Sequence, residues 1–296
     1  MSNQQSSSQL ISLHKDGLYL LDLNKTTSLK LDLPFTLPPQ TEPVCILHCH
    51  GMMCLTLKDN NELAIWKPTS KNFKRVPMIK PGQTKNLLGF GYDRVSNDYK
   101  IVTIIDQKTY IFRFKECSWR ESISISFKDC FFKDRTGTVL DHCMYWIADR
   151  SNKEKSILCF DFVNEEYSNL KVPMMLSGLE FNSWLDVSRG QLCVISHYPS
   201  LEDNLCVCRR EIRSGLKIVR WDSDPWMNIA GNDEEPVDIR FACIARNNEI
   251  FIVVRSLSEE EEDKVLVYNK EQNEFIKVPF SSDRLKVLGS MSSKLT

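Results

Sequence analysis

The chain has 296 residues, of which 42% are hydrophobic and 26% charged, and its formal net charge is −1. Near neutrality gives no general attraction to nucleic acid or to an anionic membrane. The opening MSNQQSSSQ lacks the basic and apolar regions of a secretory signal, and no apolar run approaches the ~20 residues of a membrane helix. We therefore expect a cytoplasmic or nuclear protein with free thiols and a disordered tail over residues 1–9.

A short phrase recurs along the chain. An apolar run ends on a large side chain, a polar turn follows, and a second large side chain comes seven positions after the first. Full copies lie at 63–73, 109–119, 157–167 and 265–275, and weaker copies lie at 18–28 and 205–215. The paired anchors of the full copies are Trp66 and Phe73, Phe112 and Trp119, Phe160 and Tyr167, and Tyr268 and Phe275.

The spacing of this phrase predicts the fold. Aligned on residues 21, 66, 112, 160, 208 and 268, the copies are 45, 46, 48, 48 and 60 residues apart. Units of this length, each reading strand, turn, strand, are typical of β-propeller blades. No long stretch has helical spacing bounded by caps, so we predict an all-β propeller of six blades over residues 10–290. The first copy starts near the N-terminus, so we expect the C-terminal RLKVLGSMSS to pair with the first blade and close the ring, leaving 291–296 as a tail.

Several runs can be placed within this plan in chain order. In the second unit GMMCLTLKD, ELAIW and FKRVP are β-rich and separated by polar turns. The runs VLDHCMYWIA at 139–148 and QLCVISHY at 191–198, and later RFACIA and EIFIVV, are expected to be inner strands. Two stretches break the period, at 221–236 and 258–263. We expect solvated loops there, with a recognition loop on one propeller face as the alternative.

Residues 87–104, LLGFGYDRVSNDYKIVTI, read as a strand, a turn and a second strand. Their order closely resembles the signature of the F-box-associated domain of plant F-box proteins. The residues that carry the match are Gly89, Phe90, Gly91, Tyr92, Asp93, Asn97, Asp98, Tyr99 and Lys100. The stretches HGMMCLTLKDNNELAIWKPTSKNFKRVP and VLDHCMYWIADRSNKEKSILCFDFVNEEYSNLKVP are similar to two further blades of that family. They depart from it at Lys67, where the family has Asn, and at Asp141-His142, where it often has Gly.

The resemblance implies a kelch-like domain that binds a protein target for an SCF (Skp-cullin-F-box) E3 ubiquitin ligase without catalysis or a cofactor. Family members carry a helical F-box that docks on a Skp-type adaptor. Here strand-like sequence begins at Leu10, so we expect no F-box and no direct contact with the adaptor, whether from truncation or degeneration. The target is unidentified. A propeller enzyme of glycosidase or oxidase type and a scaffold without ligase ties remain as alternatives.

The sequence patterns that could indicate a metal, redox or nucleic-acid site are weak. Cys45, His48, Cys49, His50 and Cys54 are zinc-type ligands, but they lie in one apolar stretch whose side chains should alternate between two faces. The pair Cys206 and Cys208 is expected to share a strand face without the turn of a redox motif. The basic stretch 71–85 is expected to be a solvated strand and loop rather than a nucleic-acid site.

Two more groups bear on catalysis. His142 and Cys143 are neighbours on an expected strand, so their side chains should point apart. The acidic residues Asp141, Asp186 and Asp238 could line a propeller channel, but they look like turn residues. We therefore assign no catalytic, cofactor-binding or metal-ligating residue from the sequence.

Overall fold

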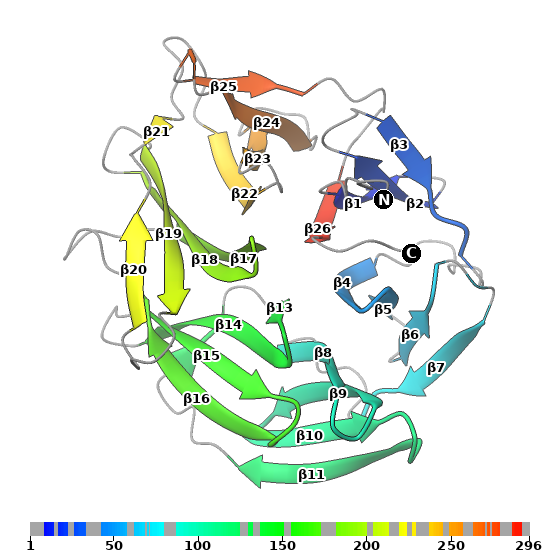
Figure 1. Cartoon of the computed structure of the whole chain (residues 1–296). Coiled ribbons are helices and arrows are strands. Elements are labelled where there is room, and N and C mark those ends of the chain that lie inside the picture. The colour runs from blue at the N-terminus through cyan, green and yellow to red at the C-terminus, as the bar shows by residue number, and fades with distance from the viewer. Residues whose placement is uncertain are drawn as a thin grey trace, which may run out of the picture. The chain divides into compact units, whose positions relative to one another are not determined.

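The structure is a computed structural model, and its described residues are almost entirely β-strand (Figure 1). No helix occurs among them, and none is therefore long and apolar enough to cross a membrane. The residues that the structure describes are 9–14, 17–22, 27–33, 43–57, 62–68, 70, 72–79, 87–124, 130–132, 137–150, 155–172, 182–199, 204–212, 219–223, 227–228, 237–244, 249–256, 263–269, 271–272, 274–278 and 286–291.

The strands form six antiparallel sheets in which most neighbouring strands follow one another along the chain. This is the up-and-down order of propeller blades, and it confirms the predicted all-β fold with six blades. The chain divides into two compact units that are described separately, the first holding residues 1–31 and 173–294 and the second holding 32–172 and 295–296.

The second unit contains three blades. Their strands are β4 (Pro43–Cys49), β5 (Met52–Leu57), β6 (Glu62–Trp66) and β7 (Phe73–Pro77); β8 (Leu87–Asp93), β9 (Asp98–Ile105), β10 (Lys108–Arg113) and β11 (Ser118–Ser124); and β12 (Cys130–Phe131), β13 (Thr138–Leu140), β14 (Cys143–Arg150), β15 (Lys155–Asp161) and β16 (Glu166–Lys171). One apolar cluster joins the three blades, and it includes the buried side chains of Ile65, Phe90, Phe112, Trp146 and Phe160.

The first unit contains the other three blades. Their strands are β17 (Asn182–Ser188), β18 (Gln191–Tyr198), β19 (Asn204–Ile212), β20 (Val219–Ser223) and β21 (Met227–Asn228); β22 (Val237–Ile244), β23 (Ile250–Ser256), β24 (Asp263–Asn269) and β25 (Glu274–Lys277); and β26 (Lys286–Met291), β1 (Gln9–His14), β2 (Gly17–Asp22) and β3 (Thr27–Lys30). Apolar clusters again join neighbouring blades. Ile195 packs with Ile252, and Leu10 packs with Phe251.

Burial follows strand position. The inner strand β18 is buried from Leu192 to Tyr198, so both of its faces are covered, as its continuous apolar sequence predicts. The outer strands are polar, and all four residues of β3 are exposed. The run 139–148 is wrong as a single inner strand, because Asp141 has a φ of 56° and a turn divides β13 from β14.

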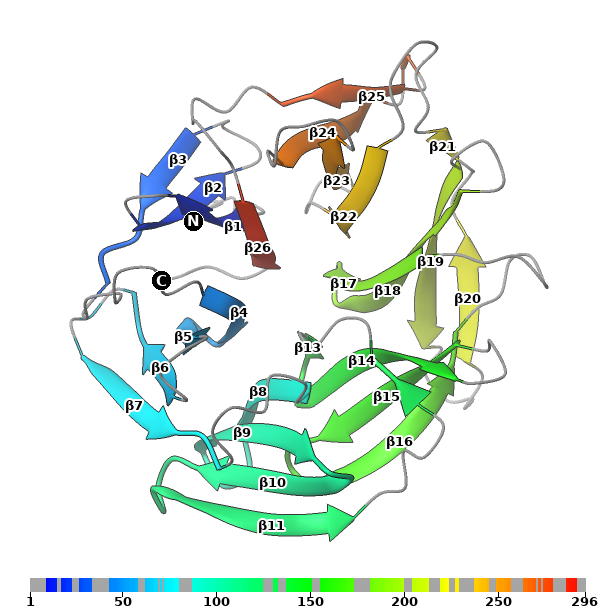
Figure 2. The same ribbon diagram turned by 180° about the vertical axis from the view of Figure 1, so that it is seen from behind.

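The C-terminal strand departs furthest from chain order. β26 pairs antiparallel with β1, with Leu10 opposite Ser290, so the tail adds a strand to the N-terminal sheet (Figure 2). Gln9 belongs to β1, whereas residues 1–8 lie outside the described part of the chain. Closure of the ring by this pairing stays a prediction.

The fifth repeat differs from the expectation at its outer edge. Residues 221–236 are not simply a loop, because Trp221–Ser223 complete β20 and Met227–Asn228 form β21, and both strands pair with β19. The anchor position Cys208 lies opposite Ser223 instead of a residue seven positions on. A longer outer turn therefore accounts for the weak copy of the phrase.

Candidate functional site

The family-like signature forms the β8–β9 hairpin of the second unit. Asp93 lies opposite Asp98, and Tyr92 lies opposite Tyr99. The Asp93 Oδ1 accepts hydrogen bonds from the amides of Val95 at 2.8 Å and Ser96 at 3.1 Å, which fixes the turn between the strands. Asn97 supplies the left-handed residue of that turn, with a φ of 53°. The acidic and amide positions of the signature are therefore required by the turn itself.

Lys100 extends from this hairpin into the neighbouring blade and is almost fully buried. Its Nζ lies 2.8 Å from Asp93 Oδ2 and 2.8 Å from Glu165 Oε1, and it donates to the Phe162 carbonyl at 2.7 Å. Glu165 also pairs with Arg113 at 2.8 Å and with Arg120. A buried ammonium surrounded by two carboxylates and a carbonyl is compensated, so this network ties the second blade of the unit to the third.

The pKa of Asp93 reflects the same contacts. Burial raises it, but hydrogen bonds from Lys100, from the Ser96 hydroxyl and from the turn amides outweigh burial and hold the pKa well below its usual range. The carboxylate is therefore ionised at neutral pH.

Two signature glycines allow the blades to approach closely. A Cβ on Gly91 would lie 1.9 Å from a Phe162 ring carbon, and one on Gly89 would lie 2.7 Å from Val102 and 2.9 Å from Trp146. The Phe90 side chain is fully buried and stacks on Tyr99, with ring centroids 5.6 Å apart. The interior half of the signature thus serves packing.

The outer half of the signature is exposed. Arg94, Val95, Ser96 and Asn97 are all solvent-accessible, and Val95 is 78% exposed. Val95 is therefore accessible at the tip of a turn that hydrogen bonds hold in place.

The turns of all three blades in the second unit lie side by side at this point. The His50 ring lies 5.0 Å from the Tyr92 ring between centroids, and Arg94 Nη2 lies 2.7 Å from His142 Nδ1. We call the surface formed by 50–51, 94–97 and 141–142 the turn face. This surface was not predicted from the sequence, although its residues occupy similar places in the repeat, 15 to 19 positions before Trp66, Phe112 and Phe160.

The paired aromatic anchors are direct cross-strand neighbours. Trp66 lies opposite Phe73, Phe112 opposite Trp119, Phe160 opposite Tyr167 and Tyr268 opposite Phe275. The last three pairs have ring centroids 5.4, 4.8 and 5.3 Å apart. Rings at this separation stabilise the two outer strands of a blade, and nothing in their geometry points to a ligand.

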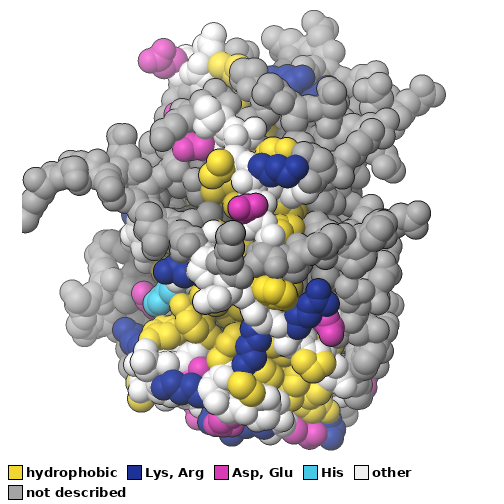
Figure 3. All heavy atoms as spheres, turned by 90° about the vertical axis from the view of Figure 1, so that its right-hand side faces the viewer, with side chains coloured by type: hydrophobic (Ala, Val, Ile, Leu, Met, Phe, Trp, Pro, Cys, Tyr) yellow, Lys and Arg dark blue, Asp and Glu magenta, His cyan; other side chains and the backbone are white. Residues whose placement is uncertain are grey.

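The strand β7 carries part of the basic stretch. Figure 3 shows the side of the molecule with β7, where hydrophobic side chains alternate with Lys and Arg. Lys74 Nζ lies 5.5 Å from the Phe112 ring centroid, and Arg75 lies 5.9 Å from that of Phe73 and 3.2 Å from Glu62. These cations already interact with rings and a carboxylate, which disfavours a phosphate-binding role. The other end of the basic stretch, at 80–85, lies outside the described residues.

The cysteine-rich stretch 45–54 forms β4, a turn and β5. Cys49 and Cys54 are buried in the apolar cluster, and burial raises the pKa of each thiol to about 12. Burial lowers the pKa of His48 to about 4, whereas His50 is exposed in the turn. The side chain of Cys45 is outside the described set. Cys49 and Cys54 therefore behave as core residues, and Cys206 and Cys208 are likewise buried on β19.

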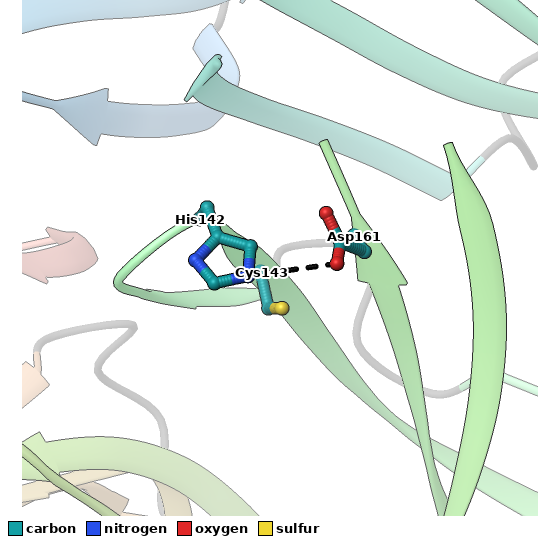
Figure 4. Close-up of side chains that lie close together, drawn as sticks. All are labelled: His142, Cys143 and Asp161. Atoms are coloured by element: carbon teal, nitrogen blue, oxygen red, sulfur yellow. Dashed lines mark ion pairs between the residues drawn. The ribbon is translucent and has the colours of Figure 1, made fainter. Parts of the chain in front are cut away.

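The expectation that His142 and Cys143 point apart is wrong. His142 lies in the turn before β14 instead of on a strand, and its ring turns toward Cys143 and Asp161 (Figure 4). One ligand atom from each of the three residues lies within 4.8 Å of the others, and His142 Nε2 is 3.5 Å from Asp161 Oδ2. This is a cluster of a nitrogen, a sulfur and an oxygen ligand beside the turn face.

The structure does not place all three acidic candidates in turns. Asp141 is a turn residue as expected, but Asp186 is not, because it lies buried within β17. Its carboxylate accepts from the amides of Ile244 at 2.6 Å and Val187 at 2.7 Å, so it joins β17 to β22. Asp238 lies in β22, and its side chain is outside the described set.

Comparison with known proteins agrees with this geometry. The model of the F-box associated beta propeller domain matches residues 9–292, and the chain belongs to that family. It is 42% identical over 187 residues to an Arabidopsis thaliana protein named among the F-box proteins, At3g16210, covering 61% of this chain and 51% of that protein. It is 26% identical over 184 residues to the F-box/kelch-repeat protein At3g23880 of the same plant, covering 58% of this chain and 50% of that protein. The chain thus spans about half the length of these relatives.

Solved structures support the fold alone. A chain of the nidogen/laminin complex matches with a TM-score of 0.55 at 10% identity, covering 94% of this chain and 96% of that one. The Cps50 (Swd1) β-propeller domain of Myceliophteria thermophila matches with a TM-score of 0.52 at 8% identity, covering 90% of this chain and 81% of that one. The fold is a six-bladed β-propeller, and domains of this family are generally non-catalytic binding modules typical of substrate recognition by F-box proteins.

Proposed function

We propose that this propeller binds a protein target and presents it to an SCF-type ubiquitin ligase without taking part in the chemistry. The observation that carries the proposal is the family match over residues 9–292. It works in the cytoplasm or nucleus and uses no cofactor, since selective binding needs only a rigid and complementary surface.

We infer further that the turn face contacts the target. The buried network around Lys100 holds the turns rigidly, and Val95 at their tip offers an exposed apolar side chain beside Arg94 and His50. Rigid turns with an apolar centre and a polar rim are suited to protein recognition, because little conformational entropy is lost on binding.

Attachment to the ligase is assigned to a different element. An F-box is helical, whereas the described residues of this chain are strands, so the propeller itself should not bind the Skp-type adaptor. Pull-down of purified adaptor by the 296-residue chain tests this directly. Stoichiometric capture would contradict the assignment and place the adaptor contact on the propeller.

Crosslinking and mass spectrometry of the tagged chain in plant extract test the target surface. We expect a set of proteins that is captured by the wild type and lost when Val95→Asp is introduced. Leu29→Asp is the matched control, because Leu29 is 65% exposed but lies on the outer strand β3. Equal loss in both variants would refute the turn face as the binding surface.

A further inference from the structure

We propose that His142, Cys143 and Asp161 bind a divalent cation of the zinc type. The three residues come from the β13–β14 turn and the facing ends of β14 and β15, where Cys143 lies directly opposite Asp161. Imidazole, thiolate and carboxylate are the three ligand types that zinc takes in proteins. The proposal is independent of the protein-binding function above.

The separations suit a tetrahedral ion. With metal bonds of about 2.0 to 2.3 Å, neighbouring ligand atoms of a tetrahedral zinc lie roughly 3.3 to 3.7 Å apart. His142 Nε2 and Asp161 Oδ2 are already 3.5 Å apart, and the Cys143 sulfur lies within 4.8 Å of a ligand atom of each of these residues. A shift of about 1 Å by the sulfur completes three corners. Because Cys143 and His142 are only half-buried, the fourth corner can be taken by water or by a ligand from a partner.

The remaining contacts leave Asp161 able to bind. Its Oδ1 accepts from the amides of Val163 at 2.7 Å and Asn164 at 3.1 Å, and its Oδ2 accepts from the Asn164 side chain at 2.9 Å. A carboxylate oxygen has two lone pairs, so Oδ2 keeps one for the metal. These bonds also fix the orientation of the carboxylate, as hydrogen bonds to metal ligands commonly do.

Two contacts oppose binding and make the proposal testable. Arg94 donates to His142 Nδ1 at 2.7 Å, which places the ring proton on Nε2, the atom that must face the metal. Metal binding moves that proton to Nδ1 and displaces the exposed Arg94. The Cys143 thiol is hydrogen-bonded to Cys159 and partly buried, and both effects raise its pKa.

Binding is therefore coupled to one proton. The thiol of Cys143 loses its proton to solvent as the metal–sulfur bond forms, whereas the imidazole only exchanges one tautomer for the other.

Cobalt and zinc titrations of the full chain test the site. With Co²⁺ in the presence of a phosphine reductant, we expect a sulfur-to-cobalt charge-transfer band that saturates at one ion per chain and disappears on addition of Zn²⁺. Cys143→Ser should abolish the band, and His142→Ala should weaken zinc binding by at least about tenfold in calorimetry. The matched controls are Cys117→Ser and His50→Ala, which alter an exposed thiol and an exposed ring elsewhere in the same unit.

Substituting Arg94→Ala should raise the affinity for zinc, whereas the substitutions of the ligands should lower it. Removing the cation and its hydrogen bond to Nδ1 should strengthen zinc binding several-fold. Circular dichroism and the melting temperature of each metal-free variant establish that the fold persists. The proposal is overturned if the cobalt band is absent from the wild type, survives in Cys143→Ser, or is lost equally in Cys117→Ser. Failure of target capture by Val95→Asp bears only on the turn face, because that variant leaves all three ligands in place.

Discussion

Asp93 and Lys100 begin and end the charged part of the signature hairpin, and their side chains meet at 2.8 Å with exposures of 5% and 3%. Glu165 approaches the same ammonium from the next blade, with Oε1 at 2.8 Å. A single lysine thus satisfies a turn carboxylate and joins two blades, which explains why both residues occur in one short motif.

Substituting Lys100→Met should be strongly destabilising. It leaves Asp93 and Glu165 buried without their shared cation, and loss of one partner of a buried pair costs about 3 to 5 kcal/mol. Urea or guanidinium unfolding followed by fluorescence measures the change. The control is Lys108→Met, because Lys108 pairs with Glu121 at 2.9 Å on the surface, and its unfolding midpoint should not move. Equal effects in the two variants would contradict the role assigned to Lys100.

Gly91→Ala tests the close approach of the blades. The added Cβ would overlap the Phe162 ring, so we expect a loss of about 1 to 3 kcal/mol or more. The loss should shrink in a Phe162→Leu background, where the ring is removed. Gly190→Ala is a useful comparison, because its Cβ would meet nothing within 4 Å and only the φ of 71° is penalised. No relief in the Phe162→Leu background would show that the ring is not the obstacle.

The sequence predicted the blades well because each full copy of the phrase encodes a local structure. Phe160 and Tyr167 are separated by a tight turn that brings them opposite each other, so a fixed spacing in sequence becomes a fixed contact in space. The fifth blade departs from the repeat at Cys208, whose partner is Ser223 rather than a residue seven positions on. The spacing of the repeat cannot predict which residues pair when the turn between two strands is longer than in the other copies.

The site residues were harder to predict for a different reason. The meeting of Arg94 with His142 and of Lys100 with Glu165 joins positions 48 and 65 residues apart, which only the packing of neighbouring blades determines. His142 and Cys143 were assigned to an unbroken strand, whereas the left-handed Asp141 places a turn there and brings the two side chains together. The expected alternation of side chains therefore does not hold for His142 and Cys143, because β14 is shorter than the apolar run in the sequence.

A hydrogen bond between Thr109 and Tyr167 connects two neighbouring blades, and its contribution to stability can be measured. The Tyr167 hydroxyl lies 3.1 Å from the Thr109 hydroxyl, and burial raises the pKa of Tyr167 despite that bond. Tyr167→Phe should cost about 1 kcal/mol, and so should Thr109→Val. A double-mutant cycle should give a coupling energy of about 1 kcal/mol, and strict additivity would show that the two hydroxyls do not interact.

Asp186 should make stability depend on pH. Burial raises its pKa to about 6, and the amide hydrogen bonds from Ile244 and Val187 counter burial only in part. Since the folded-state pKa is above the ordinary value of 3.8, the contribution of this group is full below about pH 4 and is lost as the pH rises through 6. The loss amounts to about 3 kcal/mol. Asp186→Asn keeps an acceptor oxygen without the charge, so the difference in unfolding free energy between the variant and the wild type should grow by that amount from about pH 4 to 7. A constant difference would contradict the raised pKa.

Deleting residues 284–296 tests the role of β26. Its removal leaves the backbone groups of β1 unpaired along one edge, from Gln9 to Leu13, and an exposed edge both lowers stability and promotes association between chains. We expect the melting temperature to fall by about 5 °C or more and light scattering to increase. The matched control is deletion of 292–296, which lie beyond β26 and should change neither quantity. If the longer deletion melts like the wild type, β26 does not close the propeller, and β1 must be held by its pairing with β2 alone.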